Sequence, residues 1–341
     1  MRFRSKYKNS GWTRVSLFRR NMIVCMITSH KVRSFVLGQL GTNSAREIEN
    51  IFLNLENSNK KKSTVRKVFN REGKLTTDPI QIMNEWEVFY SDLYGGSTSV
   101  DTRSFSSFLS HLNEIPFWVE EKKNVCEGKL GYGECYNALQ TFQKNKSPGN
   151  DGLIIKFYLA FWPVFGSLLV QSLNYAFEYG ELSNSQKQAV ITLVEKRGKG
   201  KRQIKNWRPI SLINVDARIA SKTLAKRLEN VLPEIIHFDQ SAFVKGRTIF
   251  DAIRTTDDVI EHTMNRDISR ILVEIDFEKA FDFLNFSFLV RVLHAFNFSP
   301  SFIHWVRVLY NKVSSCVMNN DFTSGPFSLS RGVRKGDPLS P

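Results

Sequence analysis

One stretch, residues 270–285, most constrains what this chain can fold into. It opens with the apolar, β-branched run Ile271–Ile275, which predicts a largely buried strand. That strand ends on Asp276, and a second acid, Asp282, follows among phenylalanines. A carboxylate at the end of a buried strand is costly unless a cation meets it. Two interpretations are open from these residues: Asp276 binds a divalent metal, or Asp276 and Asp282 cap the helix that follows.

The positive charge of the chain indicates a polyanionic partner, and this charge is unevenly distributed. The 341 residues are 42% hydrophobic, enough for a globular core, and carry a formal net charge of +15. Residues 1–46 contain ten Lys or Arg and no acid, so the rest of the chain is only mildly basic. Charge alone does not distinguish nucleic acid from an acidic membrane. We expect residues 1–44 to be a basic arm without fixed structure, with an organellar transit peptide as the alternative.

The cysteines and the apolar runs exclude several classes of protein. Cys25, Cys126, Cys135 and Cys316 form no C-x-x-C pair, so neither a zinc site nor a disulfide framework is expected. This usage is typical of a reducing compartment, the cytosol or the nucleus. No apolar run approaches the ~20 residues that a membrane-spanning helix needs, and we expect no membrane partner.

Residues 45–140 are predicted to be mostly helical. Ser44 and Glu47 form a capping box ahead of apolar residues at helical spacing. Further helices are expected from Pro79 to the Gly95-Gly96 pair and over residues 132–142, with a basic strand-turn-strand between residues 60 and 75.

A basic hairpin is predicted between two apolar strands. The strand at residues 188–194 leads into a Gly-containing turn and then into Trp207-Arg208-Pro209. The turn carries six basic residues, Lys196, Arg197, Lys199, Lys201, Arg202 and Lys205. Ammonium and guanidinium groups on a rigid tip suit a polyphosphate, whereas the alternative is an ordinary solvated surface.

The rest of the chain alternates helices with loops. Helices are expected over residues 153–179, interrupted at Trp162-Pro163, and over 219–232, 249–264 and from Pro300 onward. Asp257 and Asp258 point in different directions on such a helix and are assigned to a solvated face. A hairpin is expected at residues 314–329. The final loop, residues 330–341, is rich in Gly, Arg and Lys and can bring backbone N–H groups close to a phosphate or a base pair.

Several motifs, taken in order, resemble the reverse transcriptase of LINE-type (non-LTR) retrotransposons. They are K-S-P-G-N-D-G-L, N-W-R-P-I-S-L-I-N, Q-S-A-F-V-K-G-R, E-I-D-F-E-K-A-F-D and R-G-V-R-K-G-D-P-L-S-P. The resemblance covers about residues 45–341 and implies an α+β, right-hand polymerase fold with an antiparallel sheet and packed helices. Fingers and an incomplete palm would occupy residues 141–341. The implied activity is RNA-directed DNA polymerisation, with Mg²⁺, deoxynucleoside triphosphates, an RNA template and a DNA primer.

The resemblance also implies a role for individual residues. Asp276 would bind the catalytic Mg²⁺ ions, and Phe281 would lie under the incoming sugar and exclude a ribose 2′-hydroxyl. The triphosphate would be held by Arg208 with Lys196 or Arg197. Lys335 and Gly336 would lie beside the nucleotide and the template, although the family usually has Gln where this sequence has Lys335. Asp282 is assigned a structural or capping role.

The sequence stops at Pro341, before the aromatic-x-Asp-Asp hairpin that supplies the other metal carboxylates in the family, and before the thumb. We therefore expect the chain as it stands to be inactive as a polymerase. One alternative is a non-enzymatic RNA- or DNA-binding remnant or a maturase-like protein. Another is an unstable product with an exposed sheet edge. The resemblance implies a ribonucleoprotein found in the nucleus and the cytoplasm.

Overall fold

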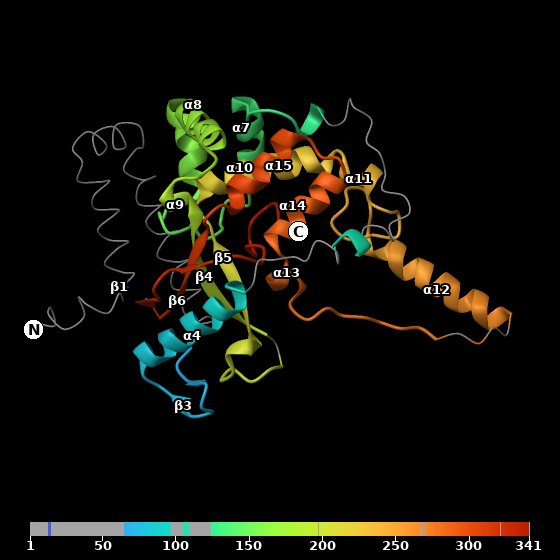
Figure 1. Cartoon of the computed structure of the whole chain (residues 1–341), viewed down its shortest axis with the longest axis horizontal. Coiled ribbons are helices and arrows are strands. Elements are labelled where there is room, and N and C mark those ends of the chain that lie inside the picture. Colours follow the sequence, from blue (N-terminus) through green and yellow to red (C-terminus); the bar gives the residue numbers. More distant parts are fainter. Residues whose placement is uncertain are drawn as a thin grey trace, which may run out of the picture.

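The computed structural model describes residues 13–14, 65–96, 105–108, 124–196, 198–266, 269, 271–320 and 322–340. Almost all of the predicted basic arm, the capping box at Ser44 and Glu47 with its helix, and Arg197 lie outside the described residues. The chain belongs to the α+β class, as predicted, with helices packed around one sheet (Figure 1).

The central sheet is mixed, with strand order β1-β7-β6-β4-β5 and β8 paired with β6. Its long strands are β4 (Gln188–Glu195), β5 (Trp207–Leu212) and β6 (Ser314–Asn319). The short ones are β1 (Thr13–Arg14), β7 (Phe322–Thr323) and β8 (Phe327–Ser328). β4 and β5 form the predicted antiparallel hairpin. β4 and β6 are parallel, so the sheet is not antiparallel throughout, because several helices cross over between these two strands.

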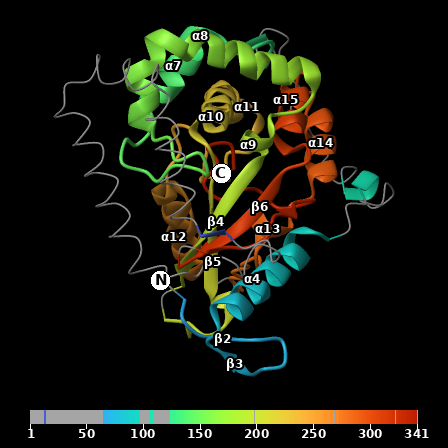
Figure 2. The same ribbon diagram turned by 90° about the vertical axis from the view of Figure 1, so that its left-hand side faces the viewer.

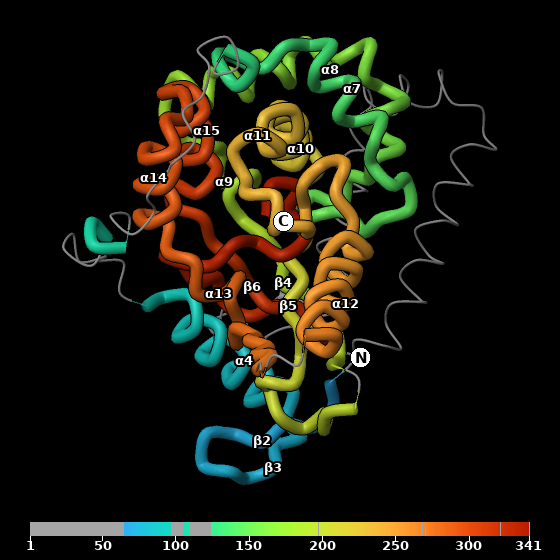
Figure 3. Tube along the Cα trace, turned by 90° about the vertical axis from the view of Figure 1, so that its right-hand side faces the viewer, coloured from blue at the N-terminus to red at the C-terminus, as the bar shows by residue number. Residues whose placement is uncertain are grey.

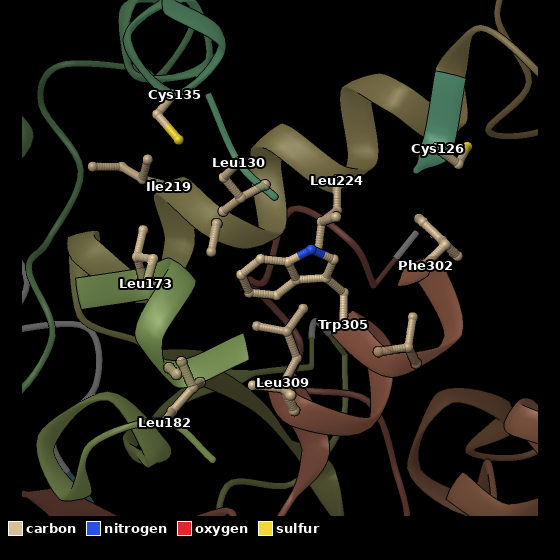
Figure 4. Packing of buried hydrophobic residues seen from close by; sticks show 14 of the residues in the cluster. Cys126, Leu130, Cys135, Leu173, Leu182, Ile219, Leu224, Phe302, Trp305 and Leu309 are labelled. Carbon is tan, nitrogen blue, oxygen red and sulfur yellow. The ribbon is translucent and has the colours of Figure 1, made fainter. Parts of the chain in front are cut away.

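Two large hydrophobic cores occupy the described part of the protein, the larger one among the helices and the second between one helix and the sheet. The larger core joins η1 (Asn124–Cys126), α7 (Tyr132–Gln140), α8 (Ile155–Tyr179), α10 (Val215–Glu229), α11 (Leu232–Ile235), α14 (Phe286–Ala295) and α15 (Pro300–Tyr310). At its centre lies Trp305, surrounded by side chains of α8, α10 and α15 (Figure 4). The second core packs α4 (Pro79–Tyr94) against β4, β5 and β6, on the lower side of the sheet in Figure 2.

Local sequence signals place most of the helix ends. Asp78 caps α4 by accepting a hydrogen bond from the Ile80 amide, and Gly95 ends that helix. The hairpin of β2 (Val68–Phe69) and β3 (Leu75–Thr76) turns at Gly73, whose φ is +78°. The predicted break in α8 is wrong, because the helix runs through Pro163 without interruption.

The predicted strand at Ile271–Ile275 is also wrong. After α12 (Ile249–Asn265), residues 271–277 form an irregular, extended segment that leads to α13 (Ala280–Phe283), as Figure 1 shows from the side; Figure 3 shows α12 and α13 from the end of the molecule where α12 lies. No described strand pairs with this segment, and Ile271 is 89% exposed and Ile275 72% exposed. A buried strand needs neighbours for its backbone groups and cover on its faces, and the described residues supply neither here.

Candidate polyphosphate-binding site

Hydrogen bonds hold the described residues at the tip of the β4–β5 hairpin. The amide of Lys196 donates to the carbonyl of Asn206 at 3.0 Å, and the Asn206 side chain donates to the Gly200 carbonyl at 2.8 Å. The indole N–H of Trp207 donates to the Lys201 carbonyl at 2.9 Å, and this indole is buried against α4. These bonds, with the short 3₁₀ helix η2 (Ile204–Asn206), fix the turn from both sides.

Five cations from three separate parts of the chain converge beside this hairpin. Burial lowers the pKa of the Lys196 ammonium, and the positive charges of Lys199, Lys279, Arg208 and Lys335 lower it further. We call these five residues the cationic cluster. The structure thus brings together three of the predicted residues, Lys196, Arg208 and Lys335. Mutual repulsion of this kind is relieved when a polyanion binds, which makes the cluster suited to a phosphate chain.

Lys279 belongs to the cluster but was not among the predicted site residues. It precedes α13 with a left-handed φ of +55°, and its ammonium lies 5.4 Å from the centre of the Phe89 ring and 6.0 Å from that of Phe283. Its position inside the motif E-I-D-F-E-K-A-F-D is the sequence signal that could have identified it.

The loop at residues 330–337 lies directly against β5. The amide of Ser211 donates to the Lys335 carbonyl at 2.7 Å. Gly336 has a φ of +117°, and a Cβ there would lie 2.8 Å from the Ser211 carbonyl oxygen. Glycine is therefore required at this position, both for the backbone conformation and for the close approach.

Asp282 is a buried anchor for this loop. It is 3% exposed, and its two carboxylate oxygens accept from the Tyr94 hydroxyl at 3.0 Å and from the Lys335 ammonium at 2.7 Å. Burial and the Asp282 charge raise the pKa of the Tyr94 phenol, which therefore stays protonated and donates. The neighbouring Phe281 is 45% exposed, and its carbonyl accepts from the Val333 amide at 2.9 Å.

The structure does not assemble a metal site around Asp276. Asp276 lies in the exposed segment 271–277. Within the described part of the chain, no group of three or more His, Cys, Asp or Glu side chains is arranged to hold a metal ion. Asp257 and Asp258 are exposed on α12, as predicted for a solvated face.

A separate hollow of about 810 Å³ opens between α14 and α15, and its lining includes Arg291, His294 and Arg307. None of the predicted site residues that lie in the described ranges lines it. None of the helices in the described ranges is both long enough and apolar enough to span a membrane.

Comparison with known families and proteins gives a consistent result. Residues 194–341 match the family described as "Reverse transcriptase (RNA-dependent DNA polymerase)". The chain is 35% identical over 289 residues, 85% of its length, to the "Transposon TX1 uncharacterized 149 kDa protein" of Xenopus laevis. It is 28% identical over 199 residues, 58% of its length, to the "Retrovirus-related Pol polyprotein from type-2 retrotransposable element R2DM" of Drosophila melanogaster.

A third relative is the "Retrovirus-related Pol polyprotein from type-1 retrotransposable element R2" of Popillia japonica, 26% identical over 40% of the chain and 19% of the relative. The chain spans 22% of the Xenopus protein and 18% of the Drosophila protein. It therefore corresponds to about a fifth of the length of the curated relatives that it matches.

Proposed function

Because residues 194–341 carry a reverse transcriptase domain related to those of non-LTR retrotransposons, we propose that this chain contributes the nucleotide site of an RNA-directed DNA polymerase. The observation that supports this function most directly is the cationic cluster. All five of its cations lie within the range that matches the family. They come from three separate segments: the hairpin, the residue before α13 and the loop at residues 330–337.

Reverse transcriptases in general use Mg²⁺ and deoxynucleoside triphosphates and act on a template and a primer. In this chain, Arg208 and Lys196 would hold the triphosphate, with Lys199 and Lys279 adding charge. A planar guanidinium can donate two parallel hydrogen bonds to one phosphate, whereas an ammonium acts as a point charge. Gly336 would let the backbone approach the nucleotide closely, and Phe281 would border its sugar. Arg197, predicted beside Lys196, lies outside the described residues.

For the metal, we propose Asp276 as one carboxylate ligand. Bound Mg²⁺ would stabilise the charge that develops on the phosphoryl oxygens during nucleotidyl transfer. The described residues do not complete such a site. No metal-dependent step follows from Asp276 alone.

We propose that the partners are an RNA template and a DNA primer, in a ribonucleoprotein of the nucleus and cytoplasm. Residues 141–341 would form the fingers and part of the palm around them. The basic hairpin supports this proposal, because phosphate contacts by Lys and Arg release counterions and give a binding affinity that falls steeply with salt.

The nucleotide site can be tested by binding of a fluorescent deoxynucleoside triphosphate. Replacing Arg208 with Met removes charge-assisted hydrogen bonds worth about 1.5–3 kcal/mol, so the dissociation constant should rise at least about tenfold. Lys201→Met is the matched control: Lys201 lies on the same hairpin, pairs with Glu195 at 2.8 Å and is outside the cluster. Equal effects of the two substitutions would contradict the assignment of the triphosphate to the cluster.

Primer extension on an RNA template tests the catalytic part of the proposal. Synthesis by the wild type that is lost in Asp276→Ala would support Asp276 as a metal ligand. Salt-sensitive RNA binding without nucleotide binding would instead favour the non-enzymatic alternative.

A further inference from the structure

The ion pair between Asp282 and Lys335 joins three parts of the molecule that surround the proposed nucleotide site. Asp282 lies in α13, Lys335 is bonded through its carbonyl to Ser211 of β5, and the other oxygen of Asp282 accepts from Tyr94 at the end of α4. The side chain of Asp282 is 4% exposed and that of Lys335 is 27% exposed. Separating the two side chains would leave the buried Asp282 carboxylate without a compensating charge, which is costly. The ion pair therefore holds α13 and the loop of Lys335 together.

The backbone around this pair is bonded at two further points. The Val333 amide donates to the Phe281 carbonyl at 2.9 Å, and the Gly332 amide donates to the Leu284 carbonyl at 2.7 Å. Gly332 has a φ of +84°, and a Cβ there would lie 2.7 Å from the Asp282 carbonyl oxygen and 2.9 Å from the Tyr94 ring. The segments 281–284 and 332–335 therefore fit closely against each other, and the backbone of Phe281 is bonded to the second segment.

Lys335 also differs from the other cations of the cluster. Within the described part of the chain, Lys335 has a carboxylate partner at 2.7 Å, whereas Lys196, Lys199, Arg208 and Lys279 form no ion pair. Lys196 donates instead to a backbone carbonyl, and Lys279 lies over aromatic rings. The charge of Lys335 is thus already balanced inside the protein, while the four other cations remain available to phosphate.

We propose that Asp282 and Lys335 are positioning residues that favour deoxyribonucleotides over ribonucleotides by fixing Phe281, and that Lys335 is not a phosphate ligand. The inference rests on the proposed nucleotide site, in which Phe281 borders the sugar. An aromatic ring whose backbone is held in place excludes an additional 2′-hydroxyl, whereas a ring whose backbone can shift does not. Discrimination should therefore depend on the ion pair, while affinity for the triphosphate should not.

The first experiment compares binding of a fluorescent deoxynucleoside triphosphate with that of the matching ribonucleoside triphosphate, in the presence of MgCl₂. In Lys335→Met the preference for the deoxynucleotide should fall about tenfold while its own affinity changes less than about threefold. Lys335→Gln keeps a donor for Asp282 and should retain most of the preference. Lys199→Gln, which removes a cation without an ion pair, should weaken both nucleotides alike. If Lys335→Met also weakens both nucleotides alike, the positioning role is wrong.

The second experiment needs no nucleotide. Amide hydrogen exchange at Gly332 and Val333 should be at least about tenfold faster in Lys335→Met and in Asp282→Asn than in the wild type or Lys199→Gln. Unchanged exchange would overturn the proposal. If the wild type binds neither nucleotide, the proposed function fails, and the exchange rates still decide whether the ion pair fixes the segment at Phe281.

Discussion

At the residue scale, Arg227 on α10 donates hydrogen bonds to three backbone carbonyls of a loop beside the larger core. The residue is 8% exposed. Its guanidinium donates to the carbonyls of Glu127, Gly128 and Lys129 at 3.0, 3.1 and 2.9 Å, and it binds both carboxylate oxygens of Glu134. One side chain therefore holds the loop between η1 and α7 onto α10.

Replacing Arg227 with Met should lower the free energy of unfolding by about 3–5 kcal/mol, because three carbonyls and a carboxylate lose their partner. Urea unfolding measures this change. Lys226→Met is the control, since Lys226 is only half-buried and donates to a single carbonyl, that of Asn137. It should cost less than about 0.5 kcal/mol. A small effect of Arg227→Met would mean that water replaces the guanidinium.

At the scale of elements, the loop P-G-N-D-G is docked on the start of α10. The side-chain oxygen of Asn214, the residue before α10, accepts from the Asp151 amide at 3.2 Å, and its amide group donates to the Ser185 carbonyl at 3.0 Å. Gly149 touches the same residue: a Cβ there would lie 2.2 Å from the Asn214 side-chain oxygen and 2.4 Å from its backbone nitrogen.

Gly149→Ala should therefore force the loop away from α10 and lower the unfolding free energy by about 1–3 kcal/mol. Gly133→Ala provides the opposite case, because Gly133 lies in α7 with no atom within 4 Å of its Cβ position. Alanine there should raise the stability by about 0.5–1 kcal/mol. Thermal unfolding of both variants checks the sign, and a stabilised Gly149→Ala would contradict the docking.

The elements also show what the sequence could and could not predict. Caps and turns located α4 and the β4–β5 hairpin, because these signals are local. The parallel pairing of β4 with β6 has no local signal, since Gln188 and Ser314 are far apart in the sequence. The strand prediction at Ile271–Ile275 was wrong for a related reason. Its β-branched composition favours a buried strand, but none of the described strands pairs with this segment. The motifs nominated Arg208 and Lys335 as candidate site residues, but the ion pair of Lys335 with Asp282 became visible only in three dimensions.

At the scale of the whole molecule, a large apolar surface is exposed along α12 and residues 271–277, which we call the apolar ridge. Its side chains are between 40% and 89% exposed. They are Ile249, Phe250, Ile253, Val259, Ile260, Met264, Ile271, Leu272, Val273, Ile275 and Phe277. Exposed apolar side chains in such number promote association in water.

We predict that the chain self-associates with increasing concentration, and that Phe250→Glu combined with Ile253→Glu shifts it toward the monomer. Sedimentation velocity measures the distribution of species. Thr255→Glu combined with His262→Glu adds two negative charges to exposed residues on the opposite face of α12 and should change little. Equal behaviour of both double variants would mean that net charge, rather than the ridge, controls association.

The hydrogen bonds between Val65 and Asn319 have a consequence for synthesis on the ribosome. The Asn319 side chain accepts from the Val65 amide at 2.9 Å and donates to its carbonyl at 3.0 Å, across 254 positions of sequence. Asn319 also ends β6, the strand that β4 needs as its parallel neighbour. The emerging polypeptide therefore cannot close its sheet until almost all of these residues have left the exit tunnel, and β4 must wait with one edge unpaired. Slow translation would prolong that wait, so the yield of native protein should depend on how fast the codons between β4 and β6 are read.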